Sequence, residues 1–305
     1  MSERYPRVRR YSQDGLLALR EGVHLCFFMR RSHAEISPIV ARALDVYLDT
    51  VGHERLGWYA SPEGDIQPLN DKGWEYVRYR LLDTADTEGC SLELLEHSNQ
   101  VAGYRFKYNG NKLDSPAAAR WPGMVSGVSF WLPTEYLEEQ GPGRVRELAV
   151  AMARELPLTT GYVSLAFNSM EVRGADRIIR ELCVQYPGLD VHDLDGTTMA
   201  IGAGVRGPYW LNFFGQPLLG QLGGTEALRA RLPHPEVDIQ ELEQEKVLVA
   251  LGEWPVMGHE EQTERLRPYR ELARVLEPHL YEETMRWRSL NPARMRKWQR
   301  RFLDT

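Results

Sequence analysis

The sequence predicts a protein of the α/β class, taken broadly to include α+β folds, with two repeated halves and a C-terminal extension. Short apolar runs that open with glycine alternate with longer segments of helical periodicity. The order strand–helix–strand–helix–strand–strand occurs twice along the chain. Gly22 and Gly127 lie 105 positions apart, and so do Tyr104 and Tyr209. These observations predict that the second half repeats the fold of the first.

The first half opens with an apolar, aromatic-rich run at residues 22–30, which is typical of a buried strand. The segment 32–52 is predicted to be a helix, because Ser32 is a suitable N-cap, apolar residues recur at helical spacing and Gly52 ends the pattern. A strand, a shorter helix and two strands joined by a turn at 98–100 follow at residues 56–61, 73–83, 91–97 and 102–110.

The second half begins with a strand at 127–133 and a helix at 143–157. Residues 189–196, with the sequence LDVHDLDG, are predicted to form a short strand that ends in a turn. A strand, a helix and a final strand are expected at residues 161–168, 174–188 and 207–215. Because helical crossovers alternate with one hairpin, each half is predicted to form a mixed sheet with helices packed on it.

The C-terminal extension is predicted to contain a hairpin and helices. A short helix follows Pro217, a hairpin turns at 244–246, and a helix spans 263–281. Asn291 and Pro292 begin a last helix, whose apolar stripe consists of Met295, Trp298 and Phe302. The predicted organisation is a tail at 1–20 and one domain at 21–305, made of repeats at about 22–110 and 127–215 and an extension at 216–305.

Composition excludes several classes of protein. The net charge of −6 gives no basic excess for nucleic acid, which is therefore not an expected partner. No run of eighteen apolar residues predicts a membrane span, and the first residues do not resemble a signal peptide, so a cytoplasmic protein is expected. Cys26, Cys90 and Cys183 are odd in number and far apart, which predicts buried free thiols rather than disulfides or a zinc site.

The motifs of common enzymes, such as GxSxG, HExxH and the P-loop, are absent, and the sequence predicts no enzyme, metal or cofactor. One alternative is a metal-dependent hydrolase that uses Asp190, His192, Asp193 and Asp195. On a strand, Asp190 and His192 point to one side and Asp193 to the other, which favours turn-forming aspartates over a shared ion.

A second alternative is a binder of single-stranded nucleic acid that uses the basic C-terminal helix and its tryptophans. The favoured interpretation is a terminal helix with an apolar inner face and a solvated basic face. That face consists of Arg294, Arg296, Lys297, Arg300 and Arg301.

Four stretches resemble the type VI secretion immunity family: GVRGPYWLNFFGQPLLGQLGG, VLVALGEWPVMG, YRELARVLEP and LNPARMRKWQRRF. The resemblance extends from about Gly22 to Phe302 and rests on structural rather than catalytic motifs. The family is described as the immunity partner of VRR-Nuc-type nuclease effectors. The resemblance therefore implies a protein that binds and neutralises a cognate toxin without catalysis, and it carries no functional residue onto this chain. A monomer or a homodimer is expected.

The toxin-binding surface is predicted from charge. A nuclease holds phosphates in a positive groove, so an inhibitor that enters the groove gains association rate from opposite charge. The most acidic segment is the predicted hairpin, and the aspartates of DLDG come second. The predicted toxin-binding residues are Asp238, Glu241, Glu243, Asp193 and Asp195.

Overall fold

One sheet of eleven strands organises the protein, whose computed structural model describes residues 7–83, 89–116, 118–169, 175–258, 264–282 and 292–304. The strands lie in the order β10-β11-β9-β8-β2-β7-β6-β5-β3-β4, and β1 pairs with β2 outside this path. The bounds of the strands are β1 Arg10–Tyr11, β2 Leu17–Met29, β3 Trp58–Ala60, β4 Ile66–Pro68, β5 Cys90–Leu95, β6 Arg105–Gly110, β7 Ser126–Pro133, β8 Thr160–Ser169, β9 Leu211–Phe214, β10 Val237–Leu242 and β11 Lys246–Leu251.

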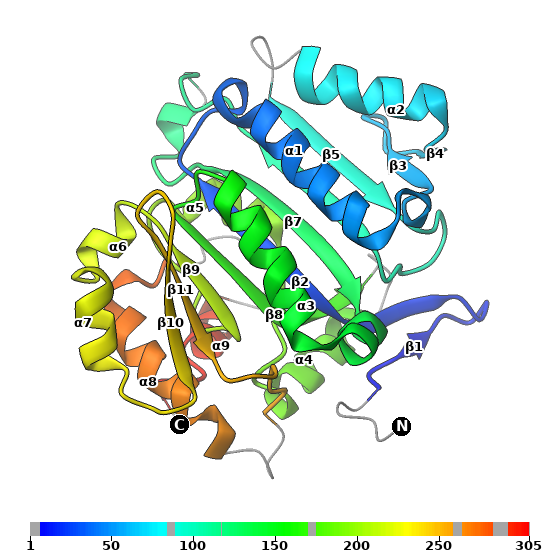
Figure 1. The fold of residues 1–305 in the computed structure, drawn as a ribbon. Helices are drawn as coiled ribbons and strands as arrows, with labels where there is room; N and C mark the ends of the chain where they lie inside the picture. Colours follow the sequence, from blue (N-terminus) through cyan, green and yellow to red (C-terminus); the bar gives the residue numbers. More distant parts are fainter. Residues whose placement is uncertain are drawn as a thin grey trace.

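Helices cover the sheet, and the long helices α1 and α3 lie side by side over its central strands (Figure 1). The bounds of the helices in the described ranges are α1 His33–Val51, α2 Asp71–Arg78, α3 Thr134–Glu155, α4 Ala175–Gln185, α5 Leu194–Ala200, α6 Leu218–Gln221, α7 Gly224–Arg231, α8 Arg267–Leu276 and α9 Pro292–Gln299. In this part of the chain, no helix combines the length and the apolar character needed to cross a membrane.

The two halves of the chain meet at the centre of the sheet. β2 of the first half pairs with both β7 and β8 of the second half, and four strands lie on each side of the β2–β7 pair. The predicted α+β class is confirmed. The expectation of two mixed sheets is wrong, because the halves share one sheet and all its strand ladders are antiparallel.

The arrangement of strands also differs from the predicted correspondence between the halves. β3 and β8 are predicted counterparts, yet β8 lies beside β2 and β3 lies one strand from the edge. By position in the sheet, the counterpart of β8 is β6, which adjoins β7. The domain bounds predicted from the sequence stay a prediction.

The predicted tail contributes to the fold from residue 7 onward. β2 begins at Leu17, and the short β1 pairs with it. The backbone nitrogen of Val8 donates a hydrogen bond to the buried carboxylate of Glu21 at 2.9 Å, and Arg9 forms an ion pair with Glu135 of α3. These contacts attach the N-terminal segment to the centre of the sheet.

Alternation along β2 sorts side chains between the two faces of the sheet. Val23, Leu25 and Phe27 lie in the main apolar core, together with the inward residues of α1 and α3. Burying each such side chain stabilises the fold by about 1.5–3 kcal/mol. His24 and Cys26 point to the opposite face, where α5 packs.

Local signals in the sequence place several elements as predicted. α1 begins after Ser32, whose backbone nitrogen donates to Glu35 at 2.8 Å, and it ends at Gly52 with φ of 100°. The hairpin between β10 and β11 turns at Gln244 and Glu245, both of which have positive φ. The buried stripe of α9 is also confirmed, whereas α7 was not predicted.

His33, the first residue of α1, gives the protein a predicted sensitivity to acid. Its side chain is 1% exposed, and Nδ1 lies 2.9 Å from the Tyr108 hydroxyl. Burial lowers the pKa of His33 to about 4. The imidazole is therefore protonated near pH 6.5 in the unfolded chain but only near pH 4 in the folded protein. Lowering the pH across this interval reduces the stability of the fold.

We expect the free energy of unfolding to drop by about 2 kcal/mol between pH 7 and 4.5 on account of His33 alone. His33→Gln keeps a polar partner for Tyr108 and does not titrate, so the variant should lose correspondingly less stability over the same range. Urea unfolding at the two pH values measures the difference. An equal loss in both proteins would contradict this role for His33.

Candidate functional site

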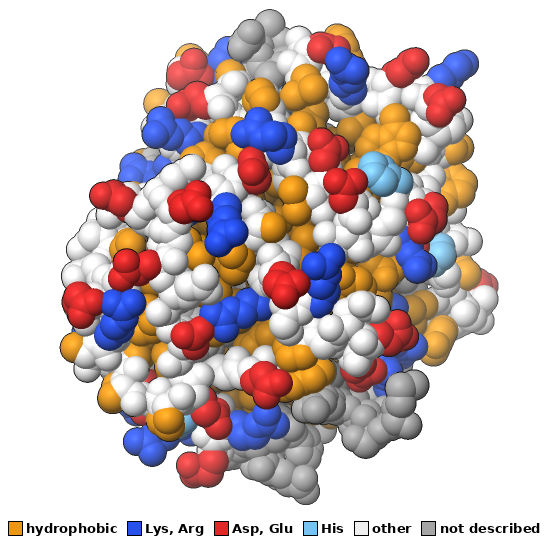
Figure 2. All heavy atoms as spheres, viewed as in Figure 1, with side chains coloured by type: hydrophobic (Ala, Val, Ile, Leu, Met, Phe, Trp, Pro, Cys, Tyr) orange, Lys and Arg blue, Asp and Glu red, His pale blue; other side chains and the backbone are white. Residues whose placement is uncertain are grey.

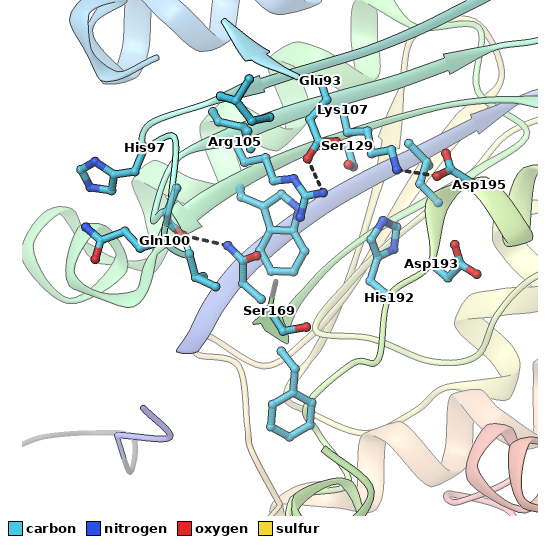
Figure 3. A pocket seen from close by; sticks show the side chains of 18 of the residues that line it. Glu93, His97, Gln100, Arg105, Lys107, Ser129, Ser169, His192, Asp193 and Asp195 are labelled. Carbon is cyan, nitrogen blue, oxygen red and sulfur yellow. Dashed lines mark hydrogen bonds and ion pairs between the residues drawn. The ribbon is translucent and has the colours of Figure 1, made fainter. Parts of the chain in front are cut away.

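A cavity of about 480 Å³ opens on the sheet face opposite α1 and α3, bordered by β5, β6, β7 and the segment that leads into α5. Arg105 and Lys107 project from β6 into it, as Figure 3 shows. Arg105 forms an ion pair with Glu93, and Lys107 forms one with Asp195 of α5. The cations of the cavity are therefore neutralised by carboxylates of the same chain.

Beside the cavity lies a buried ionic network centred on Asp190, which is 0% exposed. Its carboxylate accepts hydrogen bonds from the hydroxyls of Tyr162 at 2.8 Å and Tyr209 at 3.1 Å, and Arg206 lies 3.4 Å away. Burial disfavours the charge of Asp190, but Arg206, His24, Arg301 and the hydrogen bond from Tyr162 together outweigh burial and hold the pKa of Asp190 below its ordinary value.

Arg206 in turn connects the network to α5. Its guanidinium donates to the hydroxyl of Thr197 and to the backbone carbonyl of Val191, both at 2.6 Å. Its side chain is almost wholly buried, so these bonds replace solvent. The network fixes the segment that carries His192 against β8.

His24, Cys26 and His192 form a third group, here called the His–Cys–His cluster. One possible ligand atom of each lies within 4.8 Å of the others. The His24 ring lies 3.8 Å from the His192 ring and 4.3 Å from Trp131, measured between ring centroids. Burial lowers the pKa of His24 to about 3 and lowers that of His192 as well, so both imidazoles are neutral near pH 7.

Much of the hydrogen-bonding capacity of this cluster is unused. Both ring nitrogens of His24 and Nε2 of His192 are buried and have no hydrogen-bond partner within the described ranges. The hydroxyl of Ser129, a residue that lines the cavity, is also buried and has no hydrogen-bond partner within the described ranges. The other nitrogen of His192 lies 3.4 Å from the Tyr162 hydroxyl. Such a concentration of unpaired buried polar atoms is uncommon in folded proteins.

The four residues of the predicted hydrolase site do not converge. Asp190 belongs to the ionic network, and His192 belongs to the His–Cys–His cluster. The segment 189–196 is not a strand that ends in a turn. Asp190 forms only an isolated bridge with Ala166, and Asp193 is the N-cap of α5, accepting a bond from the Gly196 nitrogen at 3.1 Å. No ligand set for a hydrolytic metal results from these four positions.

The predicted acidic surface is exposed but partly paired. Asp238, Glu241 and Glu243 lie on or beside β10, the edge strand of the sheet. Asp238 forms an ion pair with Arg146, and Glu241 lies 3.2 Å from Arg229. The sequence does not indicate these pairings, since the partners lie on other elements, Arg146 on α3 and Arg229 on α7.

The basic C-terminal helix is only partly solvated. Arg301, predicted on the solvated face, donates to the backbone carbonyl of Pro187 at 2.6 Å and lies 3.8 Å above the ring of Trp298. Arg300 forms ion pairs with Glu277 and Asp304. These contacts use two of the cations on which the nucleic-acid alternative depends.

Comparison with known proteins gives the evolutionary context of this site. A family model described as TsiV, type VI immunity for VRR-NUC, matches residues 39–302. A search of curated proteins found no match. Among solved structures, the fold is similar to that of the Pseudomonas aeruginosa T6SS protein PA0821, with a TM-score of 0.78 and 18% sequence identity over 97% of this chain and 87% of that chain.

The family model covers most of the chain, from α1 to the end of the C-terminal segment, and therefore includes both the cavity and the acidic hairpin. It begins after β2, so His24 and Cys26 lie outside the matched residues. The match confirms the resemblance seen in the sequence, and the chain belongs to the TsiV family of type VI immunity proteins.

Proposed function

We propose that this protein binds a cognate toxin delivered by type VI secretion and neutralises it by binding alone. The family match over residues 39–302 is the observation that carries the proposal. The family description names VRR-NUC, so the proposed toxin is a VRR-Nuc-type nuclease. Because a nuclease acts on nucleic acid inside the cell, we place the inhibition in the cytoplasm.

Charge supports the acidic hairpin as the docking surface. On the face that carries α1 and α3, acidic and basic side chains are interspersed without a patch of one sign (Figure 2). The hairpin of β10 and β11 lies beside α3 in this view (Figure 1) and carries Asp238, Glu241, Glu243 and Glu245 within one short exposed segment. Arg146 and Arg229 partly neutralise Asp238 and Glu241, respectively. Glu243 is therefore expected to contribute most to toxin binding among the predicted positions.

The carboxylates of the second acidic site, at the start of α5, have structural roles in the fold. Asp195 is exposed and paired with Lys107 at the rim of the cavity, and Asp193 caps the helix. Both carboxylates lie near the N-terminus of α5, where negative charge is stabilised by the helix dipole. We propose that they contribute to toxin binding less than the hairpin does.

Co-expression with the toxin gene tests the proposal. The protein should restore growth to cells that make the toxin and should elute with it as one complex on gel filtration. Lack of rescue together with lack of a complex would refute the proposed function.

Charge reversal tests the surface. We expect Asp238→Lys, Glu241→Lys and Glu243→Lys together to slow association with the toxin by about tenfold or more at low salt, and by less at high salt. Stopped-flow measurement at two salt concentrations checks this. Glu63→Lys with Asp65→Lys is the matched control, because these residues lie in the β3–β4 turn at the opposite edge of the sheet.

The α5 positions need milder changes. Asp193→Ser keeps an N-cap and removes the charge, whereas Asp195→Asn removes the charge without adding bulk. A smaller fall in association rate is expected for this pair than for the hairpin set. If the hairpin set and the opposite-edge control slow association equally, the docking surface lies elsewhere.

A further inference from the structure

The His–Cys–His cluster contains more ring nitrogens than the surrounding side chains and backbone can hydrogen-bond. His24 and Cys26 are 0% exposed, and three of the four ring nitrogens of His24 and His192 are unpaired within the described ranges. Each unsatisfied buried group costs about 1–3 kcal/mol. A metal ion that binds one nitrogen of each ring would remove part of that cost.

We propose that His24, Cys26 and His192 form a three-ligand site for a divalent transition metal of the Zn²⁺ type, with a fourth position toward the cavity. Imidazole and thiolate are the ligands that Zn²⁺ prefers, and three protein ligands with one open position are a recurrent arrangement. The site is independent of the toxin and of the proposed immunity function.

The fold explains how these ligands come together. His24 and Cys26 are two positions apart on β2, so both side chains point to the same face of the sheet. β7 and β8 flank β2 along its length and hold it rigid. His192 approaches from the segment between the Asp190 bridge and α5, which is neither helix nor strand.

The distances fit after a small adjustment. Atoms bound to one tetrahedral Zn²⁺ lie about 3.3–3.8 Å apart, given bonds of about 2.0–2.3 Å. The three possible ligand atoms already lie within 4.8 Å of one another, so a shift of about 1 Å closes the site. Rotation of the His192 side chain can supply this shift while the Asp190–Arg206 network holds its backbone, because Nε2 of the ring has no hydrogen-bond partner within the described ranges.

The charged side chains around the cluster are paired with one another. The positive side chains that face the cluster are each paired with a carboxylate: Arg105 with Glu93, Lys107 with Asp195, and Arg206 with Asp190. Both imidazoles are neutral, as metal ligation requires. On binding, the S–H bond of Cys26 breaks, a metal–sulfur bond forms and one proton passes to the solvent.

The cavity provides a route to the cluster. His192 lines it directly, together with Ser129 and Trp131 of β7, and Figure 3 shows His192 beside Ser129 within it. Ser129 is the register partner of Cys26 across the β2–β7 ladder. The fourth position of the metal would therefore be taken by water from the cavity.

The test uses the reduced, untagged full chain with Co²⁺ and Zn²⁺ as probes. We expect one equivalent of Co²⁺ to bind with the visible and near-ultraviolet absorption of a tetrahedral thiolate complex, and Zn²⁺ to displace it. Cys26→Ala should abolish the thiolate-to-cobalt band, and His192→Gln should weaken Zn²⁺ affinity by about a hundredfold or more. Zn²⁺ should also raise the melting temperature of the unsubstituted protein.

Cys183→Ala and His33→Gln are matched controls, since each removes a buried thiol or imidazole outside the cluster. Both controls should bind like the unsubstituted protein. Circular dichroism establishes which variants fold. If Cys26→Ala does not fold, the Zn²⁺ affinity of His192→Gln tests the proposal. Absence of stoichiometric binding, or binding that persists in folded His192→Gln with unchanged affinity, would overturn the proposal.

Discussion

Arg206→Met is expected to lower the free energy of unfolding by about 3–5 kcal/mol, because it leaves the charge of Asp190 buried without its cation. Asp190 is 0% exposed and would keep only the hydroxyls of Tyr162 and Tyr209. The bonds from Arg206 to Thr197 and Val191, which attach α5, would also be lost. Urea unfolding near pH 7 measures this change.

A double variant separates the ion pair from packing. Asp190→Asn combined with Arg206→Met removes both charges, so its loss of stability should be well below the sum of the two single losses. Arg144→Met is the control, because its pair with Glu147 at 3.1 Å is exposed at both side chains and should contribute at most about 1 kcal/mol. Strict additivity of the two buried substitutions would refute coupling between Asp190 and Arg206.

Gly188→Ala is expected to destabilise the protein by about 2–5 kcal/mol. An added Cβ would lie 1.9 Å from the backbone carbonyl oxygen of Val256, which no side-chain rotation can relieve. The two segments would have to separate, which breaks the 2.7 Å hydrogen bond from the Gly188 nitrogen to Met257 and adds strain. Thermal and urea unfolding of the purified variant measure the effect.

Gly143→Ala is the matched control for this substitution. Gly143 lies in the first turn of α3 after the kink at Gly141, and an added Cβ there would meet nothing within 4 Å. Alanine favours a helix more than glycine does, so this variant should be at least as stable as the unsubstituted protein, with a gain of at most about 1 kcal/mol. If Gly188→Ala and Gly143→Ala change the free energy of unfolding equally, the contact at Gly188 is relieved at little cost and the prediction is wrong.

Local signals explain which parts of the fold the sequence predicts well. Ser32 and Gly52 bound α1, Pro292 begins α9, and the turn at Gln244 and Glu245 joins β10 to β11. These features depend on residues close together in the chain. The segment 189–196 was assigned incorrectly because Asp193 followed by Gly196 fits either a turn or a helix cap, and packing of α5 on the sheet selects the cap.

The order of strands and the candidate site depend on contacts that no local pattern encodes. The spacing of His24 and Cys26 could have been noticed, because alternate positions on a strand share a face. Nothing in the sequence places His192 beside them, since the neighbour of β2 is chosen by the whole sheet. The pairing of Lys107 with Asp195 is likewise a tertiary contact, which no local pattern in DLDG indicates.

The position of β2 at the centre of the sheet has a consequence for biosynthesis. β2 precedes its neighbours β7 and β8 in the chain, and its ladder with β8 joins Leu19 to Ser169, 150 positions later. At about 5–20 residues per second, the partner strand follows about 8–30 s afterwards. Until β7 is made, which takes most of that interval, the apolar β2 has neither of its long neighbours, and its ladder with β8 must wait for the whole interval. A nascent chain is therefore exposed to misassociation before it can fold.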